Sequence, residues 1–239
     1  MTSVKRARFA LIASIIITLF LYLFLDLVPF GDLIARPLIL ISTLVHELGH
    51  GFAGMLVGES FESFKMYYDG SGIAKITKPS NSKAQAFISM GGLVGPAFIG
   101  GLLLLVGKYD KICKRFLIFL GVVLLLTDIF IVENMDGWVF VTIFGGMTLL
   151  VGLKASKEFC QWYSYFIGVQ LGLSVFSRSD YLFTEYAIVD GSTKMPSDVG
   201  QISHALFFPY WVWGIVCAVI SVFFLAVGLH SVFTKPIEK

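Results

Sequence analysis

Hydrophobic residues fall in seven long runs along the chain, separated by short polar segments. The runs lie at about residues 9–30, 37–58, 84–107, 116–133, 138–153, 159–176 and 206–233. A helix needs about 20 apolar residues to cross a bilayer, and the two short runs at 138–153 and 159–176 are compatible with partly re-entrant segments. The pattern predicts an all-α polytopic membrane protein with about six to seven transmembrane helices.

Two polar segments interrupt the apolar pattern. In the first, residues 61–67 are aromatic-rich with partly alternating polarity, 69–72 (Asp-Gly-Ser-Gly) are typical of a turn, and 73–77 return to strand-forming types. A small β-hairpin is therefore expected after the second run. The second segment, 177–204, is a long polar loop with several acidic residues, and loops of this length are usually functional or disordered.

Composition supports the membrane assignment. Of the 239 residues, 56% are hydrophobic and 14% charged, whereas a soluble domain has about 45–50% and about 25%. A net charge of +2 without a basic cluster excludes nucleic acid as a partner. The lipid bilayer is the partner that the composition indicates. The oligomeric state is not determined by these features.

The N-terminal flank bears on orientation. Lys5, Arg6 and Arg8 precede a run that is too long for a signal peptide, so we expect an uncleaved first transmembrane helix. If all seven runs span, nine Lys and Arg residues fall on each side, and the positive-inside rule gives no answer for the whole chain. Only the basic first flank favours a cytoplasmic N-terminus.

One motif in the second run carries chemistry. His46-Glu47-Leu48-Gly49-His50 is a His-Glu-x-x-His sequence, and on a helix its two imidazoles share one face and can bind one metal ion. Glu47 can then take a proton from water at the metal. Ionisable side chains inside an apolar run are costly and indicate function rather than packing. The pattern predicts a Zn²⁺ site.

A catalytic zinc site has three protein ligands, so one more is required. Spacing leaves several candidates open, since folding can bring any of them to the motif: Asp128, Glu133, Asp136, Asp198 and His204. Each taken singly is also explained as a loop carboxylate, a helix cap or an interfacial histidine.

Together, the motif, the predicted hairpin, Gly91-Gly92-Leu93-Val94-Gly95-Pro96 and Asn134-Met135-Asp136-Gly137 resemble the site-2 protease family of intramembrane zinc metalloproteases. The resemblance covers residues 37–153 and implies His46, His50 and Asp136 as zinc ligands and Glu47 as general base. It further implies that Asn134 lies near the reacting carbonyl. The hairpin would hold an unwound substrate segment by strand addition through Ile73, Ala74 and Lys75.

The sequence also departs from the family pattern, because Asn134 stands too close to Asp136 and no Pro separates them. It is similar to a small bacterial branch, the M-fifty-B-like peptidases, through its Asp-Gly-Ser-Gly turn and through Ser197-Asp198 before a Pro- and Trp-containing last helix. In that branch the position of Asp136 is often not acidic. We expect Asp136 as the third ligand, with Asp198 as its rival.

The expected protein is one membrane-embedded metalloprotease domain over residues 1–239. It comprises a first transmembrane helix at 1–35, the protease-like core at 37–153, and C-terminal helices with the polar loop at 159–239. We expect it to cleave membrane-embedded or membrane-adjacent peptides in a bacterial inner membrane. The alternatives are a non-proteolytic scaffold or chaperone, which would not need Glu47, and a metal-ion transporter, which would need polar residues along several spans.

Overall fold

The structure is a computed structural model that describes residues 3–24, 31–177, 180–189 and 193–234. Within these residues the chain is mostly helical, and each hydrophobic run forms a helix of at least 20 residues. These helices are α1 (Ser3–Phe24), α2 (Gly31–Leu56), α3 (Ser82–Gly107), α4 (Asp110–Phe130), α5 (Met135–Lys154), α6 (Lys157–Ser177) and α9 (Tyr210–Phe233).

Four of the described helices are both long and apolar enough to cross a membrane. These segments are Ala35–Leu56, Ser82–Gly107, Met135–Lys154 and Tyr210–Phe233. The chain is thus a polytopic membrane protein, and the count of six to seven spans stays a prediction for the remaining helices.

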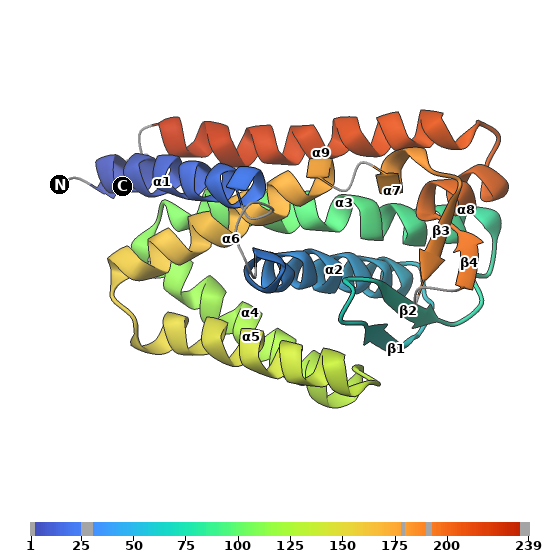
Figure 1. Cartoon of the computed structure of the whole chain (residues 1–239), viewed down its shortest axis with the longest axis horizontal. Coiled ribbons are helices and arrows are strands. Elements are labelled where there is room, and N and C mark those ends of the chain that lie inside the picture. The colour runs from blue at the N-terminus through green and yellow to red at the C-terminus, as the bar shows by residue number, and fades with distance from the viewer. Residues whose placement is uncertain (1–2, 25–30, 178–179, 190–192, 235–239) are drawn as a thin grey trace.

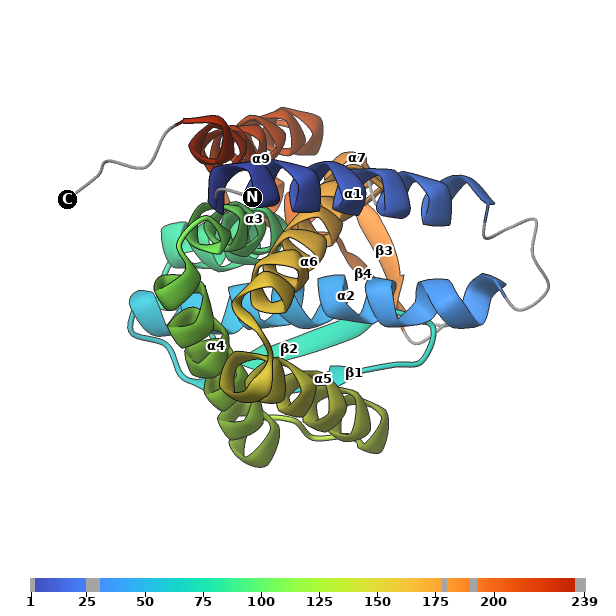
Figure 2. The same cartoon turned by 90° about the vertical axis from the view of Figure 1, so that its left-hand side faces the viewer.

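Helix α3 lies at the centre of the bundle and packs against α2, α6, α9 and the short helix α8 (Asp198–Ala205) (Figures 1 and 2). Its contact with α2 is a backbone approach between glycines: a Cβ atom on Gly49 would lie 2.3 Å from the carbonyl oxygen of Gly91. Small residues at such a crossing let two helices approach closely. This contact brings the backbone of α3 against the face of α2 that carries the two histidines.

The predicted hairpin follows α2 and is confirmed. Strand β1 (Phe61–Met66) pairs antiparallel with β2 (Gly72–Ile76). The turn between them uses Gly70, whose φ of +91° belongs to the left-handed region that glycine occupies without strain. The hydroxyl of Thr43 on α2 donates to the Gly70 carbonyl at 2.6 Å, so the turn is fixed to the helix that carries the motif.

The outer edge of β1 is covered by the α4–α5 connection. The Phe64 N–H donates to the Ile131 carbonyl at 3.0 Å, and the Glu133 N–H donates to the Phe64 carbonyl at 3.0 Å. The backbone groups of Phe64 therefore point away from β2, so Phe64 and its partner Ala74 form a non-hydrogen-bonded pair of the antiparallel ladder. In such a pair the N–H and C=O groups of both residues point outward, and those of Ala74 point away from β1. The outer edge of β2 therefore presents its backbone to the motif helix.

The polar segment at 177–204, expected as a loop, contains short elements of its own. They are α7 (Asp180–Phe183), a second hairpin of β3 (Tyr186–Val189) and β4 (Thr193–Pro196), and α8 (Asp198–Ala205). Helix α8 is held by apolar burial, since Val199 and Ile202 are fully buried in a cluster with Leu93 and Cys217. Each such side chain contributes about 1.5–3 kcal/mol on burial, enough to fix a two-turn helix to the bundle.

Candidate metal centre

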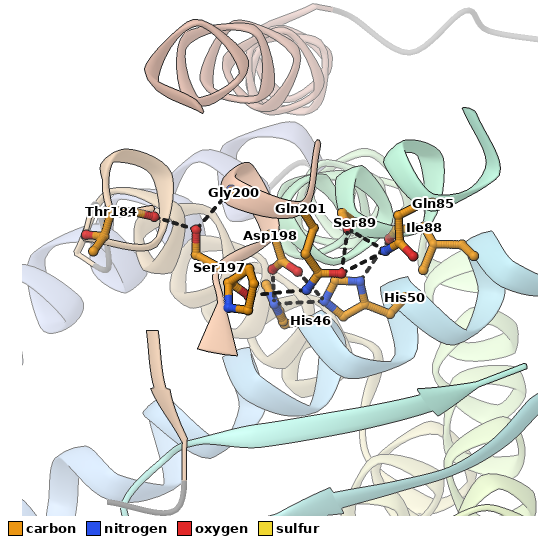
Figure 3. Close-up of polar contacts among 11 residues, drawn as sticks. His46, His50, Gln85, Ile88, Ser89, Thr184, Ser197, Asp198, Gly200 and Gln201 are labelled. Carbon is orange, nitrogen blue, oxygen red and sulfur yellow. Dashed lines mark hydrogen bonds and ion pairs between the residues drawn. The ribbon is translucent and has the colours of Figure 1, made fainter. Parts of the chain in front are cut away.

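The imidazoles of His46 and His50 converge on the carboxylate of Asp198 (Figure 3). The Nε2 atom of His46 lies 2.9 Å from Oδ2 of Asp198, and Nε2 of His50 lies 3.3 Å from Oδ1. The two Nε2 atoms are 3.1 Å apart. The histidines share one face of α2 because they are four residues apart, whereas Asp198 is the first residue of α8.

The donor set fits a metal ion. Two imidazole nitrogens and a carboxylate oxygen, all within 4.8 Å of one another, form a group that can hold one. Ligands about 2.1 Å from one ion at tetrahedral angles would lie about 3.4 Å apart, close to the observed separations. Three electron-pair donors gathered this tightly are stable only around a cation or shared protons.

The orientation of His50 is set by α3. Its Nδ1 atom lies 2.8 Å from the Ile88 carbonyl oxygen, which can only accept, so Nδ1 carries the hydrogen. In the neutral ring, Nε2 then presents its lone pair to the centre. The ring fits because α3 has a glycine at position 92: a Cβ there would lie 2.2 Å from Nε2 of His50.

The Asp198 carboxylate is held at the centre by the start of α8. Its neighbour Ser197 is buried, accepts a hydrogen bond from the Gly200 N–H at 3.1 Å, and donates to the Thr184 carbonyl. Ser197 is thus an N-cap that also joins α8 to the end of α7. Burial raises the pKa of the Asp198 carboxyl, but the facing imidazoles, in their protonated form, hold it well below its ordinary value.

Glu47 lies between the histidines and β2. Its carboxylate is buried and receives the backbone N–H of Ala74 on the outer edge of that strand. The approach is so close that a Cβ on Gly72 would lie 2.7 Å from Oε1 of Glu47. Gly72 and Gly92 were not expected in the site, although both belong to segments that carry the family resemblance, the Asp-Gly-Ser-Gly turn and residues 91–96.

A cavity of about 300 Å³ contains the three converging side chains and Glu47. Its lining includes Ile73 and Ala74 of β2 and Ala187 and Met195 of the second hairpin. Lys75 does not line the cavity, because its ammonium pairs with Glu62 on β1 at 2.9 Å. Of the strand residues expected to contact substrate, the structure brings Ile73 and Ala74 to the cavity.

Asp136, the expected third ligand, is not brought to the histidines. It is exposed in the first turn of α5, next to the covered edge of β1, and does not belong to the converging group. The physical reason is that the α4–α5 connection joins the side of the hairpin facing away from α2. Of the two rival carboxylates, the structure thus brings Asp198, and not Asp136, to the two histidines.

Asn134 also lies elsewhere than near the reacting carbonyl, where the family resemblance put it. Its side chain donates to the Met66 carbonyl at 2.5 Å and accepts the Met66 N–H at 3.1 Å. It thereby acts as an extra strand residue on the edge of β1. Both polar atoms of its amide are engaged there, away from the cavity.

The other carboxylates and the histidine considered as ligands make separate contacts. Asp128 is buried and accepts from Thr142, joining α4 to α5. Glu133 pairs with Lys65 at 3.6 Å, and His204 lies 3.7 Å from Glu185. None of the three belongs to the group at His46.

Comparison with known families identifies the class of protein. The profile of the peptidase M50B-like family matches residues 8–228, nearly the whole chain. This chain therefore belongs to the peptidase M50B-like family, which confirms the resemblance to the site-2 proteases. No curated protein and no solved structure matches it.

Proposed function

We propose that this protein is an intramembrane zinc metalloprotease that hydrolyses peptide bonds of membrane-embedded or membrane-adjacent substrates. One observation carries the proposal: His46, His50 and Asp198 converge in a cavity that also contains Glu47. Two imidazoles and one carboxylate form a donor set typical of catalytic zinc sites, in which a fourth position is left open. We accordingly assign these three side chains as ligands and Zn²⁺ as the cofactor.

Bound zinc would supply a water of lowered pKa and polarise the scissile carbonyl. The carboxylate of Glu47 accepts the proton as the water oxygen bonds to the carbonyl carbon. The same proton is then delivered to the amide nitrogen as the carbon–nitrogen bond breaks, leaving an amine and a carboxylic acid, which releases its remaining proton to solvent. Glu47 suits both steps because the Ala74 N–H and the neighbouring Gly72 fix its carboxylate beside the cavity.

The cavity also suggests how a substrate is held. The outer edge of β2 pairs with no further strand in the described part of the chain, and there the Ala74 N–H donates to Glu47, whereas β1 is covered by residues 131–134. An extended peptide added along β2 would place its backbone beside Glu47. A helical segment must unwind to do so, since its own amides are otherwise engaged.

Replacement of Glu47 by Gln tests the hydrolase directly. Host membranes containing wild-type protein or Glu47→Gln are surveyed by mass spectrometry for new peptide termini. We expect termini that depend on Glu47, with about one zinc per chain retained in the purified variant. Glu62→Gln, which changes an exposed carboxylate on β1, is the matched control and should cleave normally.

Two outcomes would contradict the proposal. Wild-type protein without stoichiometric zinc would remove its chemical basis. Zinc-loaded protein whose products are unchanged by Glu47→Gln would indicate a non-proteolytic scaffold that keeps the metal-site fold.

We further propose an inner-membrane location with a cytoplasmic N-terminus. The fold gathers basic residues at the end of the bundle where α1 begins: Arg6 contacts Asp110 and Glu158, and Lys114 donates to the Ala155 carbonyl. Lys and Arg favour the cytoplasmic side. An N-terminal green fluorescent protein fusion should fluoresce, and a dark fusion with an active N-terminal alkaline phosphatase fusion would reverse the orientation.

A further inference from the structure

Several side chains that line the cavity can donate a hydrogen bond to a reacting carbonyl. Besides the histidines, they are Ser and Thr hydroxyls and two side-chain amides, Gln85 and Gln201, and among the described residues no Lys, Arg or Asn lines it. Hydrolysis of a peptide bond passes through a tetrahedral oxyanion, and a preorganised donor to that oxygen commonly contributes about 10²–10³-fold to kcat. Asn134, which the family resemblance assigned near the carbonyl, is engaged with Met66.

Gln201 stands one turn after Asp198 on α8. Residues three apart share a helix face, so the Gln201 and Asp198 side chains leave α8 on the same side. Both residues line the same cavity. The helix that supplies the third ligand thus also presents an amide to the space where substrate would bind.

The amide of Gln201 is oriented by α3. Its Oε1 atom accepts from Nε2 of Gln85 at 2.7 Å and lies 3.5 Å from the hydroxyl of buried Ser89. With its oxygen held there, Nε2 points the other way, where it makes a long 3.4 Å contact to the Pro196 carbonyl. A bond this long is weak and is readily exchanged for a better acceptor.

We propose that Gln201 is a catalytic residue whose side-chain N–H donates to the scissile carbonyl oxygen as it becomes an oxyanion. Gln85 is a positioning residue that holds the Gln201 amide in the productive orientation. The assignment rests on the proposed peptidase function and adds the donor that Asn134 does not provide. The cavity accepts uncharged substrate residues around the scissile bond, because its own charged groups are confined to the metal centre and Glu47.

The alternative is that Gln201 only joins α8 to α3. Transition-state affinity separates the two roles, because a donor aimed at the oxyanion contributes in the transition state and little in the ground state. The probes are a quenched-fluorescent peptide spanning a bond found in the terminus survey and its phosphinic analogue, which carries a tetrahedral anionic centre.

In zinc-loaded full-length protein, Gln201→Met should lower kcat about 100-fold. It should lower the affinity for the phosphinic analogue by a similar factor. Zinc content should be unchanged, as should affinity for the uncleaved peptide, measured in the Glu47→Gln background. Gln85→Met, which breaks the bridge but keeps the Gln201 N–H, should lower kcat less than about 10-fold.

Unchanged affinity for the phosphinic analogue in Gln201→Met would overturn the catalytic role. So would loss of zinc in that variant, or an equal loss of kcat in Gln85→Met, since either would make the bridge structural. Wild-type protein that binds zinc but neither cleaves the peptide nor binds the analogue would instead refute the peptidase function, and the role of Gln201 with it.

Discussion

The Nε2 atom of His46 lies 2.9 Å from Oδ2 of Asp198, although His46 is in α2 and Asp198 is far along the chain in α8. This contact joins a membrane-spanning helix to a two-turn helix docked on the bundle. Removing Asp198 should therefore remove one of three ligands. Asp198→Ala should weaken zinc binding more than about 100-fold, measured by metal content after equilibration against buffered zinc.

Asp136→Ala is the matched control for that experiment, because it removes the exposed carboxylate that does not reach the histidines. Its zinc content should equal that of the wild type. Loss of zinc from Asp136→Ala and retention by Asp198→Ala would reverse the ligand assignment.

Gly92 makes the room that the His50 ring occupies. Gly92→Ala places a methyl group 2.2 Å from Nε2 of His50, so the ring must rotate away and zinc affinity should fall by about 10-fold or more. Gly146→Ala, on α5, is the control because a Cβ there meets nothing within 4 Å. Equal zinc affinity in both variants would show that the ring has another place to go.

Asn134 should matter for the hairpin more than for the reaction. Asn134→Ala leaves the Met66 N–H and carbonyl without their partners, at a cost of about 1–3 kcal/mol. Hydrogen exchange should accelerate in 61–66, while kcat on the fluorescent peptide falls much less than in Glu47→Gln. A large loss of kcat with unchanged exchange would return Asn134 to the reacting carbonyl.

Ser197 should couple the docking of α8 to metal binding. Ser197→Ala removes both the cap to Gly200 and the bond to Thr184, and caps of this kind contribute about 0.5–2 kcal/mol. Zinc affinity should fall by up to about 10-fold, and Ser197→Thr should recover most of it. Ser156→Ala, which removes a contact to Phe159 at the start of α6, should leave zinc binding unchanged.

Removing the metal should loosen the same segment. Without zinc, the interaction of α8 with α2 loses its bridging ion, and binding free energy that favours the docked state is lost. Chelation should therefore increase hydrogen exchange in 198–205 more than in 82–107. Equal protection with and without chelator would show that apolar burial alone holds α8.

Much of the fold follows from local sequence. Every described apolar run forms a helix, because backbone groups in an apolar setting must bond within their own segment. The turn at Gly70 likewise made the first hairpin predictable. The second hairpin was missed, because its strands have four residues each and are marginal without the packing around them.

The sequence by itself determined the motif helix: His46 and His50 share a face because of their spacing, and Glu47 lies beside them. Only the tertiary structure shows which carboxylate lies with the two histidines. Asp136 and Asp198 are equivalent in chemistry, and what separates them is which side of β1 the α4–α5 connection covers and where Val199 and Ile202 dock α8. Those contacts join distant parts of the chain, and no local pattern encodes them.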